Sequence, residues 1–200
     1  MSSFANQAAF DRPASRAAAA GINLLPAQAI VDLQGRVLAH ARTGGMINPQ
    51  RHPLMKGTRL FRFGRGNQSP QDVARGAWWL EAREFELLVS FANAHGIHIG
   101  LAMRLLCLVP PEWSDAAQLV RARVSNSVLA LRGLANTVVT PIAGGLGTLR
   151  LPHKNEISAR RLHQLYIPGL TEQSSLDPAI SIERSFALDP KSSVQGFLYL

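Results

Sequence analysis

One arginine stands out within an apolar run in the first half of the chain. Arg62 lies between Phe61 and Phe63, and in a β-strand both phenylalanines would share one face while Arg62 takes the other. The phenylalanines are the natural core residues, so the pattern predicts that Arg62 faces a cleft or solvent. A guanidinium in a cleft attracts phosphate groups. On spacing alone, an exposed arginine on an edge strand is the simpler interpretation.

A second polar residue interrupts an apolar run near the end of the chain. Within residues 162–167, Gln164 shares a strand face with Tyr166 and lies opposite His163. On spacing alone, an exposed strand glutamine is the simpler interpretation of this pattern.

The other reactive side chains do not form a recognisable site. Four of the six histidines form two pairs along the chain, His95 with His98 and His153 with His163. A metal site needs three or four convergent ligands, so we expect none here. Cys107 lies in an apolar run, which is typical of a small core residue. Residues 144–147, Gly-Gly-Leu-Gly, lack the Lys-Ser/Thr of a phosphate loop, and no Gly-x-Ser-x-Gly occurs.

The positive charge falls into two blocks. The chain has a net charge of +8, and residues 36–75 hold eight Arg or Lys with one acid, while residues 121–161 hold seven with one acid. Such blocks attract phosphates in nucleic acid, in an anionic cofactor or on a partner. Two solvated basic faces would give the same composition.

Hydrophobic periodicity predicts the elements that position these residues. Period-two runs predict strands over 58–63, 76–80, 138–140, 148–151 and 162–167, with a last strand over 197–200. The 3.6-residue period predicts a helix over 81–94 and another over 114–132. The apolar run 101–109 before two prolines predicts a buried strand, and the glycines and prolines of 43–58 predict a loop.

Length and composition indicate one α+β domain, predicted over residues 27–200, after an N-terminal arm over residues 1–26. The 16 glycines and 12 prolines are too few for a collagen-like or wholly disordered chain. A single cysteine excludes a disulfide framework. The sequence has no run of 18 apolar residues and no signal-peptide pattern, so we expect no membrane contact.

The order of these segments resembles that of the ADP-ribosyltransferase-like toxin and effector domains. Their layout is a strand reading Leu-Tyr-Arg, a strand reading Gly-x-Trp or Gly-x-Phe-Trp, a helix, a strand ending in Val-Pro, and a late strand reading Glu/Gln-Tyr-x-x-Pro. The corresponding segments here are Leu60-Phe61-Arg62, Gly76-Ala77-Trp78-Trp79, the helix containing Phe85 to Phe91, Leu108-Val109-Pro110 and Gln164-Leu165-Tyr166-Ile167-Pro168. The resemblance covers residues 57–170 and implies a mixed β-sheet core with flanking helices.

The resemblance also implies that NAD is the substrate and is cleaved at its nicotinamide–ribose bond. The acceptor would be water or an unknown macromolecular group. Arg62 would bind the NAD phosphates or the nicotinamide ribose through its bidentate guanidinium, with Arg59 and Arg65 as auxiliary charges. Trp78 or Trp79 would hold the nicotinamide by stacking.

The late strand departs from the family pattern. The position that usually carries a catalytic glutamate carries Gln164, followed by Tyr166, which we expect to contribute to the NAD site. A neutral amide can hydrogen-bond the ribose, but it stabilises an oxocarbenium-like transition state less than a carboxylate does. Glu156 is the nearest acid upstream. NAD hydrolysis and a degenerate site therefore both stay open.

Two alternatives complete the expectations. A basic nucleic-acid-binding or adaptor protein would contact phosphates through Arg59, Arg62, Arg65 and Arg75, with steep salt dependence. A catalytically inactive relative would keep only the fold. A toxin of the resembled kind would need an immunity or regulatory protein, and it would be cytoplasmic or delivered into a target cell without a cleavable signal peptide.

Overall fold

The computed structural model describes residues 4–22, 29–31, 34, 37–40, 44–111, 113–141, 148–152, 162–172 and 178–189. Its centre is a seven-stranded sheet in the order β11-β6-β4-β5-β10-β7-β3. The strands are β3 (Met46–Leu54), β4 (Arg59–Gly64), β5 (Trp78–Glu81), β6 (Gln118–Val124), β7 (Val128–Ala135), β10 (His163–Tyr166) and β11 (Ile180–Ala187). All neighbours in this sheet pair antiparallel, whereas a mixed sheet was expected. The α+β class is confirmed.

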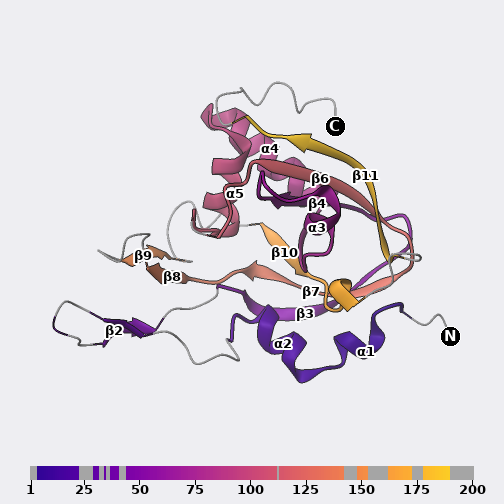
Figure 1. Cartoon of the computed structure of the whole chain (residues 1–200), viewed down its shortest axis with the longest axis horizontal. Helices are drawn as coiled ribbons and strands as arrows, with labels where there is room; N and C mark the ends of the chain where they lie inside the picture. The colour runs from indigo at the N-terminus through magenta and orange to yellow at the C-terminus, as the bar shows by residue number, and fades with distance from the viewer. Residues whose placement is uncertain are drawn as a thin grey trace.

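The sheet consists of two halves joined by the short strand β5. Only two residue pairs join β4 to β5, Leu60 with Glu81 and Phe61 with Leu80, and only two join β5 to β10. Figure 1 shows β4, β6 and β11 on one side and β3 and β7 on the other, with β10 between them. Three of the four strands in the resemblance, β4, β5 and β10, are therefore consecutive neighbours, whereas Leu108-Val109-Pro110, predicted as the strand ending in Val-Pro, lies outside any strand.

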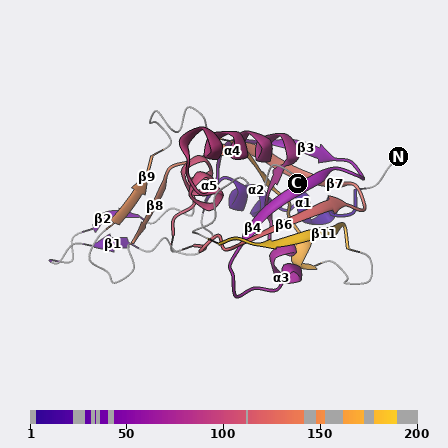
Figure 2. The same cartoon turned by 90° about the horizontal axis from the view of Figure 1, so that it is seen from above.

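Two apolar cores hold the sheet in place. One lies under α4 (Ala82–His95) and α5 (Ile99–Cys107), where Phe61 stacks on Phe85 with ring centroids 4.0 Å apart. The other includes buried side chains of both halves of the sheet and of α3 (Pro70–Ala74), with Trp79 near its centre. Figure 2 shows α3 and α4 on opposite sides of β6 and β11. Helix α4 ends at Gly96, whose φ of 60° favours glycine.

The N-terminal segment packs on the sheet. It contains α1 (Gln7–Phe10) and α2 (Pro13–Ala19), which lie beside β3 and β7 in Figure 1. Asn6 is buried, and its amide donates to the carbonyls of Leu129 and Pro168 and accepts from the Leu129 N–H. The described part of the predicted arm is thus hydrogen-bonded to β7.

The remaining elements lie at the margins of the sheet. Two small two-stranded sheets, β1 (Ala29–Val31) with β2 (Val37–His40) and β8 (Val138–Pro141) with β9 (Thr148–Leu151), lie at one end of the molecule. The 3-10 helix η2 (Leu170–Glu172) follows β10. Within the described residues, no helix is long and apolar enough to cross a membrane.

Most sequence-predicted strands are confirmed, but three predicted elements are wrong. Residues 101–107 of the run 101–109 lie in helix α5, and the prediction failed because an apolar run of this length cannot be assigned to strand or helix by periodicity. The predicted helix 114–132 is the strand pair β6 and β7, in which Val120, Ala122 and Val124 alternate with polar residues. The predicted loop 43–58 contains β3, an edge strand that tolerates its two prolines. The predicted strand 197–200 and the glycines 144–147 lie outside the described residues.

Candidate functional site

A pocket opens where β3 bulges away from regular pairing with β7. Its volume is about 280 Å³, and its lining consists of Ile47, Asn48, Gln50, Arg51, His52, Arg132, Gly133, Leu134 and His163. The pairing register shifts between Ile47 and Gln50, and Asn48 in that bulge has a φ of 45°. Asn is one of the few residues that adopts this conformation readily. A Cβ on Gly133 would lie 3.0 Å from the Ile47 carbonyl oxygen, so glycine permits the close approach of β3.

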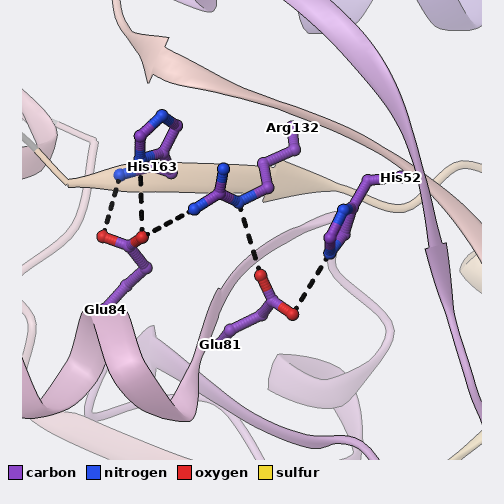
Figure 3. Close-up of polar contacts among 5 residues, drawn as sticks. All are labelled: His52, Glu81, Glu84, Arg132 and His163. Carbon is purple, nitrogen blue, oxygen red and sulfur yellow. Dashed lines mark hydrogen bonds and ion pairs between the residues drawn. The ribbon is translucent and has the colours of Figure 1, made fainter.

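Five polar side chains form a continuous chain of contacts, and three of them, His52, Arg132 and His163, line this pocket (Figure 3). The members of the chain of contacts, in order, are His52, Glu81, Arg132, Glu84 and His163. Glu84 accepts from Arg132 Nη2 at 2.8 Å and from the backbone N–H of His163 at 3.2 Å, and Glu84 Oε1 lies 3.4 Å from His163 Nδ1. On the other side, Glu81 lies 3.4 Å from Arg132 Nε and 3.2 Å from His52 Nε2. We call these five residues the His–Glu network.

Local structure explains how these groups meet. Glu81 ends β5 and Glu84 lies in the first turn of α4, where a carboxylate is favourable near the helix N-terminus. Arg132 projects from the middle of β7, and His163 is the first residue of β10, which pairs with both β5 and β7. His52 comes from β3, two residues from the partner of Arg132. Four strands and one helix therefore fix the network.

The electrostatics of the network suit a proton-transfer site. The Glu84 side chain is only 7% exposed, and its burial is tolerated because Arg132 and His163 contact it. With neutral histidines, two carboxylates and one guanidinium leave one net negative charge. The Glu84 carboxylate, 3.4 Å from Nδ1, would stabilise the imidazolium that forms when Nε2 of His163 accepts a proton. In Figure 3 the second ring nitrogen of His163 points away from Glu84, and His163 lines the pocket.

Arg62, the first residue singled out by the sequence, lies at the other end of β5. Its Nη1 donates to the Trp78 carbonyl at 2.5 Å, and its Nε is buried without a hydrogen-bond partner. Among the described residues it forms no ion pair with a carboxylate. Burial lowers the pKa of Arg62 to about 10, so it is charged at neutral pH. A Cβ on Gly76 would lie 2.0 Å from Arg62 Nη2, so a larger residue at this position would displace the guanidinium.

The two tryptophans occupy different environments, as strand alternation predicts. Trp79 is 2% exposed in the core, and its Nε1 donates to the Gly76 carbonyl at 2.8 Å. Trp78 is half-buried and meets Tyr166 edge to face, with ring centroids 5.2 Å apart. Burial raises the pKa of Tyr166.

Gln164 does not meet Arg62. Its amide donates to the Cys107 carbonyl at 2.9 Å, and the residue is 9% exposed. The pairing of Leu165 with Trp79 places Leu165 on the Trp79 side of the sheet, and Gln164 on the opposite side. Arg62 alternates with Phe61, which pairs with Leu80, so Arg62 shares the Trp79 side.

Arg59 and Arg65, predicted as auxiliary charges for Arg62, have other partners. Arg59 lies 3.4 Å from Glu183, and Arg65 donates to the Trp113 carbonyl at 3.2 and 3.1 Å. Neither contacts Arg62 through a hydrogen bond or an ion pair. Glu156, the nearest upstream acid, lies outside the described residues.

Sequence reasoning missed the residues of the His–Glu network. One signal was available, because Glu84 falls on the apolar face of α4 with Phe85 and Leu88. A carboxylate among core residues needs a buried partner. Nothing in the sequence identifies that partner, since Arg132 and His163 follow Glu84 by 48 and 79 positions.

Comparison with known proteins does not assign this chain to a family. No protein-family model matches the sequence, and no curated protein has a matching sequence. Among solved structures, the chain is similar to Rhs1-CT in complex with its cognate immunity protein RhsI1. The TM-score is 0.40 and the identity 12%, over 77% of this chain and 89% of that chain. This similarity is too low to assign a fold or a function.

Proposed function

We propose that this protein cleaves the nicotinamide–ribose bond of NAD, and that the reaction takes place at the His163 pocket. The observation that carries the proposal is the buried carboxylate of Glu84, which contacts both the backbone and the ring of His163 on β10. The resemblance places a catalytic acid on this strand, where the sequence has Gln164. Helix α4 brings a carboxylate to the same strand from another part of the chain.

The charge of the His–Glu network suits this chemistry. Cleavage of an N-glycosidic bond develops positive charge on the ribose, and fixed negative charge in a partly buried site stabilises it. The network carries one net negative charge when His52 and His163 are neutral. Arg51 also lines the pocket, but its guanidinium lies over the Phe4 ring, 5.9 Å from the ring centroid, so we assign it no role in binding the substrate.

The reaction can be written with the groups present. The bond between the nicotinamide nitrogen and ribose C1′ breaks, and its electron pair leaves with nicotinamide, which becomes neutral. A water oxygen attacks C1′, and the water proton passes to Nε2 of His163, whose positive charge the nearby Glu84 carboxylate stabilises. The products are nicotinamide, ADP-ribose and a proton. General-base assistance of this kind contributes about 10² to 10⁴ in rate.

The residues taken from the resemblance have a secondary role in the proposed reaction. The adjacency of β4, β5 and β10 supports the resemblance, and the absence of a strand at Leu108-Val109-Pro110 counts against it. Arg62, Trp78 and Tyr166, however, lie at the opposite end of β5 from Glu81, with buried Trp79 between. We therefore assign the reaction to the pocket, and propose Arg62 and the Trp78–Tyr166 pair only as further contacts of the substrate.

The resemblance also suggests a biological role for the proposed reaction. We propose an effector whose NAD cleavage is toxic and is blocked in the producing cell by a partner protein. Toxicity on expression in a bacterial host, lost in a His163→Ala variant, would support this role. Equal growth with both proteins would contradict it.

Product analysis tests the proposed reaction. Purified protein is incubated with NAD, and nicotinamide and ADP-ribose are resolved by chromatography. The proposal predicts equal amounts of both products, and a His163→Ala variant that releases both at a rate lower by about 10² or more, because general-base assistance is lost. Absence of nicotinamide with correctly folded wild-type protein would overturn the proposal.

A further inference from the structure

Three arginine side chains converge on one carboxylate on the β4–β6–β11 half of the sheet. Arg59 of β4 and Arg121 and Arg123 of β6 surround Glu183 of β11. Their Nε atoms lie 3.4, 3.1 and 2.5 Å from the nearest Glu183 oxygen, in that order. Three positive charges and one negative charge leave this group, which we call the arginine face, with a surplus of two.

The arginine face joins the two basic blocks of the sequence. Arg59 belongs to the block 36–75, and Arg121 and Arg123 belong to the block 121–161. The antiparallel pairing of β4 with β6 makes Arg59 and Arg123 direct cross-strand partners. Like charges placed opposite each other are unfavourable unless an anion lies between them, and Glu183 supplies that anion.

A β-bulge aims Glu183 at the arginines. The pairing of β11 with β6 shifts register between Ile182 and Arg184, so Glu183 is the extra residue. Its burial would raise its pKa, but the hydrogen bond from Arg123 and the charges of all three arginines outweigh burial, and the pKa is lowered. Glu183 is therefore ionised at neutral pH, where it orders the guanidiniums while leaving them a positive surplus.

The surroundings of the arginine face favour phosphate over a protein surface. Arg59 and Arg123 are 44% and 46% exposed, so their guanidiniums are accessible to a ligand. The large apolar side chains exposed within the described residues are Ile22, Met55, Leu87, Leu101 and Trp113, and none lies on β4, β6 or β11. Protein interfaces have an apolar centre, whereas nucleic-acid interfaces are polar and positively charged.

We propose that the arginine face binds the phosphate backbone of nucleic acid without reading its sequence. Guanidinium groups bind phosphate oxygens in a bidentate manner. The aromatic rings beside this face are both covered, Phe186 of β11 by the Arg184 guanidinium at 4.9 Å and Phe61, the cross-strand partner of Arg121, by Phe85, so neither offers a free platform for base stacking. This binding is separate from NAD cleavage, which takes place at the other half of the sheet.

The test measures binding by fluorescence anisotropy with a labelled DNA duplex of about 20 base pairs, from about 50 to about 200 mM salt. Each phosphate contact contributes about 0.9 to the slope of log affinity against log salt, so Arg59→Ala/Arg123→Ala should flatten the slope by about 1.8. The double variant keeps Arg121 beside Glu183. The control is the double variant Arg83→Ala/Arg150→Ala, which removes two exposed arginines on α4 and β9. It makes the same change in net charge and should leave the slope nearly unchanged.

Removing the competing carboxylate gives a second readout. Glu183→Gln frees the three guanidiniums and should tighten binding about three- to tenfold, whereas a merely structural ion cluster would give no gain. A parallel titration with single-stranded RNA of the same length distinguishes the two nucleic acids. For a single strand, each phosphate contact contributes about 0.7 to the slope of log affinity against log salt. Equal slopes for the two double variants would overturn the proposal. Binding to polyglutamate without binding to either nucleic acid would also overturn it and would identify an acidic protein as the partner.

Discussion

Replacing Glu84 with Gln should destabilise the protein measurably. The Glu84 carboxylate accepts a hydrogen bond from Arg132 Nη2 at 2.8 Å and one from the His163 N–H at 3.2 Å, and its side chain is 7% exposed. A hydrogen bond to a charged group contributes about 1.5–3 kcal/mol. Glutamine keeps the shape and one acceptor oxygen, so we expect the free energy of unfolding to fall by about 2 kcal/mol. For a chain of 200 residues this lowers Tm by about 4–8 °C.

Urea denaturation followed by circular dichroism measures this change. Glu86→Gln, on the exposed side of the same helix, is the matched control and should change the free energy of unfolding by less than about 0.5 kcal/mol. A double-mutant cycle with Arg132→Gln should give a coupling of about 1 kcal/mol or more, since the two side chains touch. Equal stabilities of Glu84→Gln and Glu86→Gln, or a coupling near zero, would refute the assignment of a buried, energetically coupled network.

Three further predictions concern other parts of the fold. Burial, aided by the charge of Glu84, raises the pKa of Cys107 to about 12. The native thiol should therefore not react with Ellman's reagent at pH 8. Rapid labelling without denaturant would contradict the burial of Cys107 in the core. Trp79→Ala should cost about 3–5 kcal/mol of stability and Trp78→Ala clearly less, measured by urea denaturation, because Trp79 alone is fully buried. The lowered pKa of Glu183 adds stability that is present above its ordinary pKa of 4.5 and is lost as the pH falls through the lower folded value. Acid titration should therefore destabilise the wild type more than Glu183→Gln, and parallel curves would contradict this.

Local patterns in the sequence were sufficient for the elements around Arg62. The alternation of Phe61, Arg62 and Phe63 predicted strand β4, and the 3.6-residue period predicted helix α4. The alternation within Trp78-Trp79 also predicted one core and one outer tryptophan, and Trp79 is the core residue.

Elements decided by tertiary packing could not be predicted in this way. Helix α5 has buried residues on most of its surface, so its sequence lacks the polar stripe that distinguishes a helix from a buried strand. Strands β6 and β7 form because each pairs with two neighbours distant in sequence, a preference that local propensity does not contain.

The candidate site depends even more on long-range pairing. Glu84 and His163 meet only because β5 and β10 are neighbours in the sheet and α4 begins at the end of β5. The bulge of β3 that opens the pocket has its one positive-φ residue at Asn48, which no motif marks. Sequence patterns therefore directed attention to Gln164, whereas the adjacent residue lines the pocket.

The kcat for NAD hydrolysis of two neighbouring variants tests the central proposal most directly. His163 and Gln164 are consecutive on β10 and face opposite sides of the sheet, where His163 lines the pocket and Gln164 bonds the Cys107 carbonyl. Each rate is normalised to the folded fraction, because Gln164 is itself buried. The proposal predicts that His163→Ala lowers kcat by about 10² or more while Gln164→Ala stays within about threefold of the wild type. Full activity in His163→Ala together with loss in Gln164→Ala would contradict the proposal and move the reaction to the opposite face of the sheet.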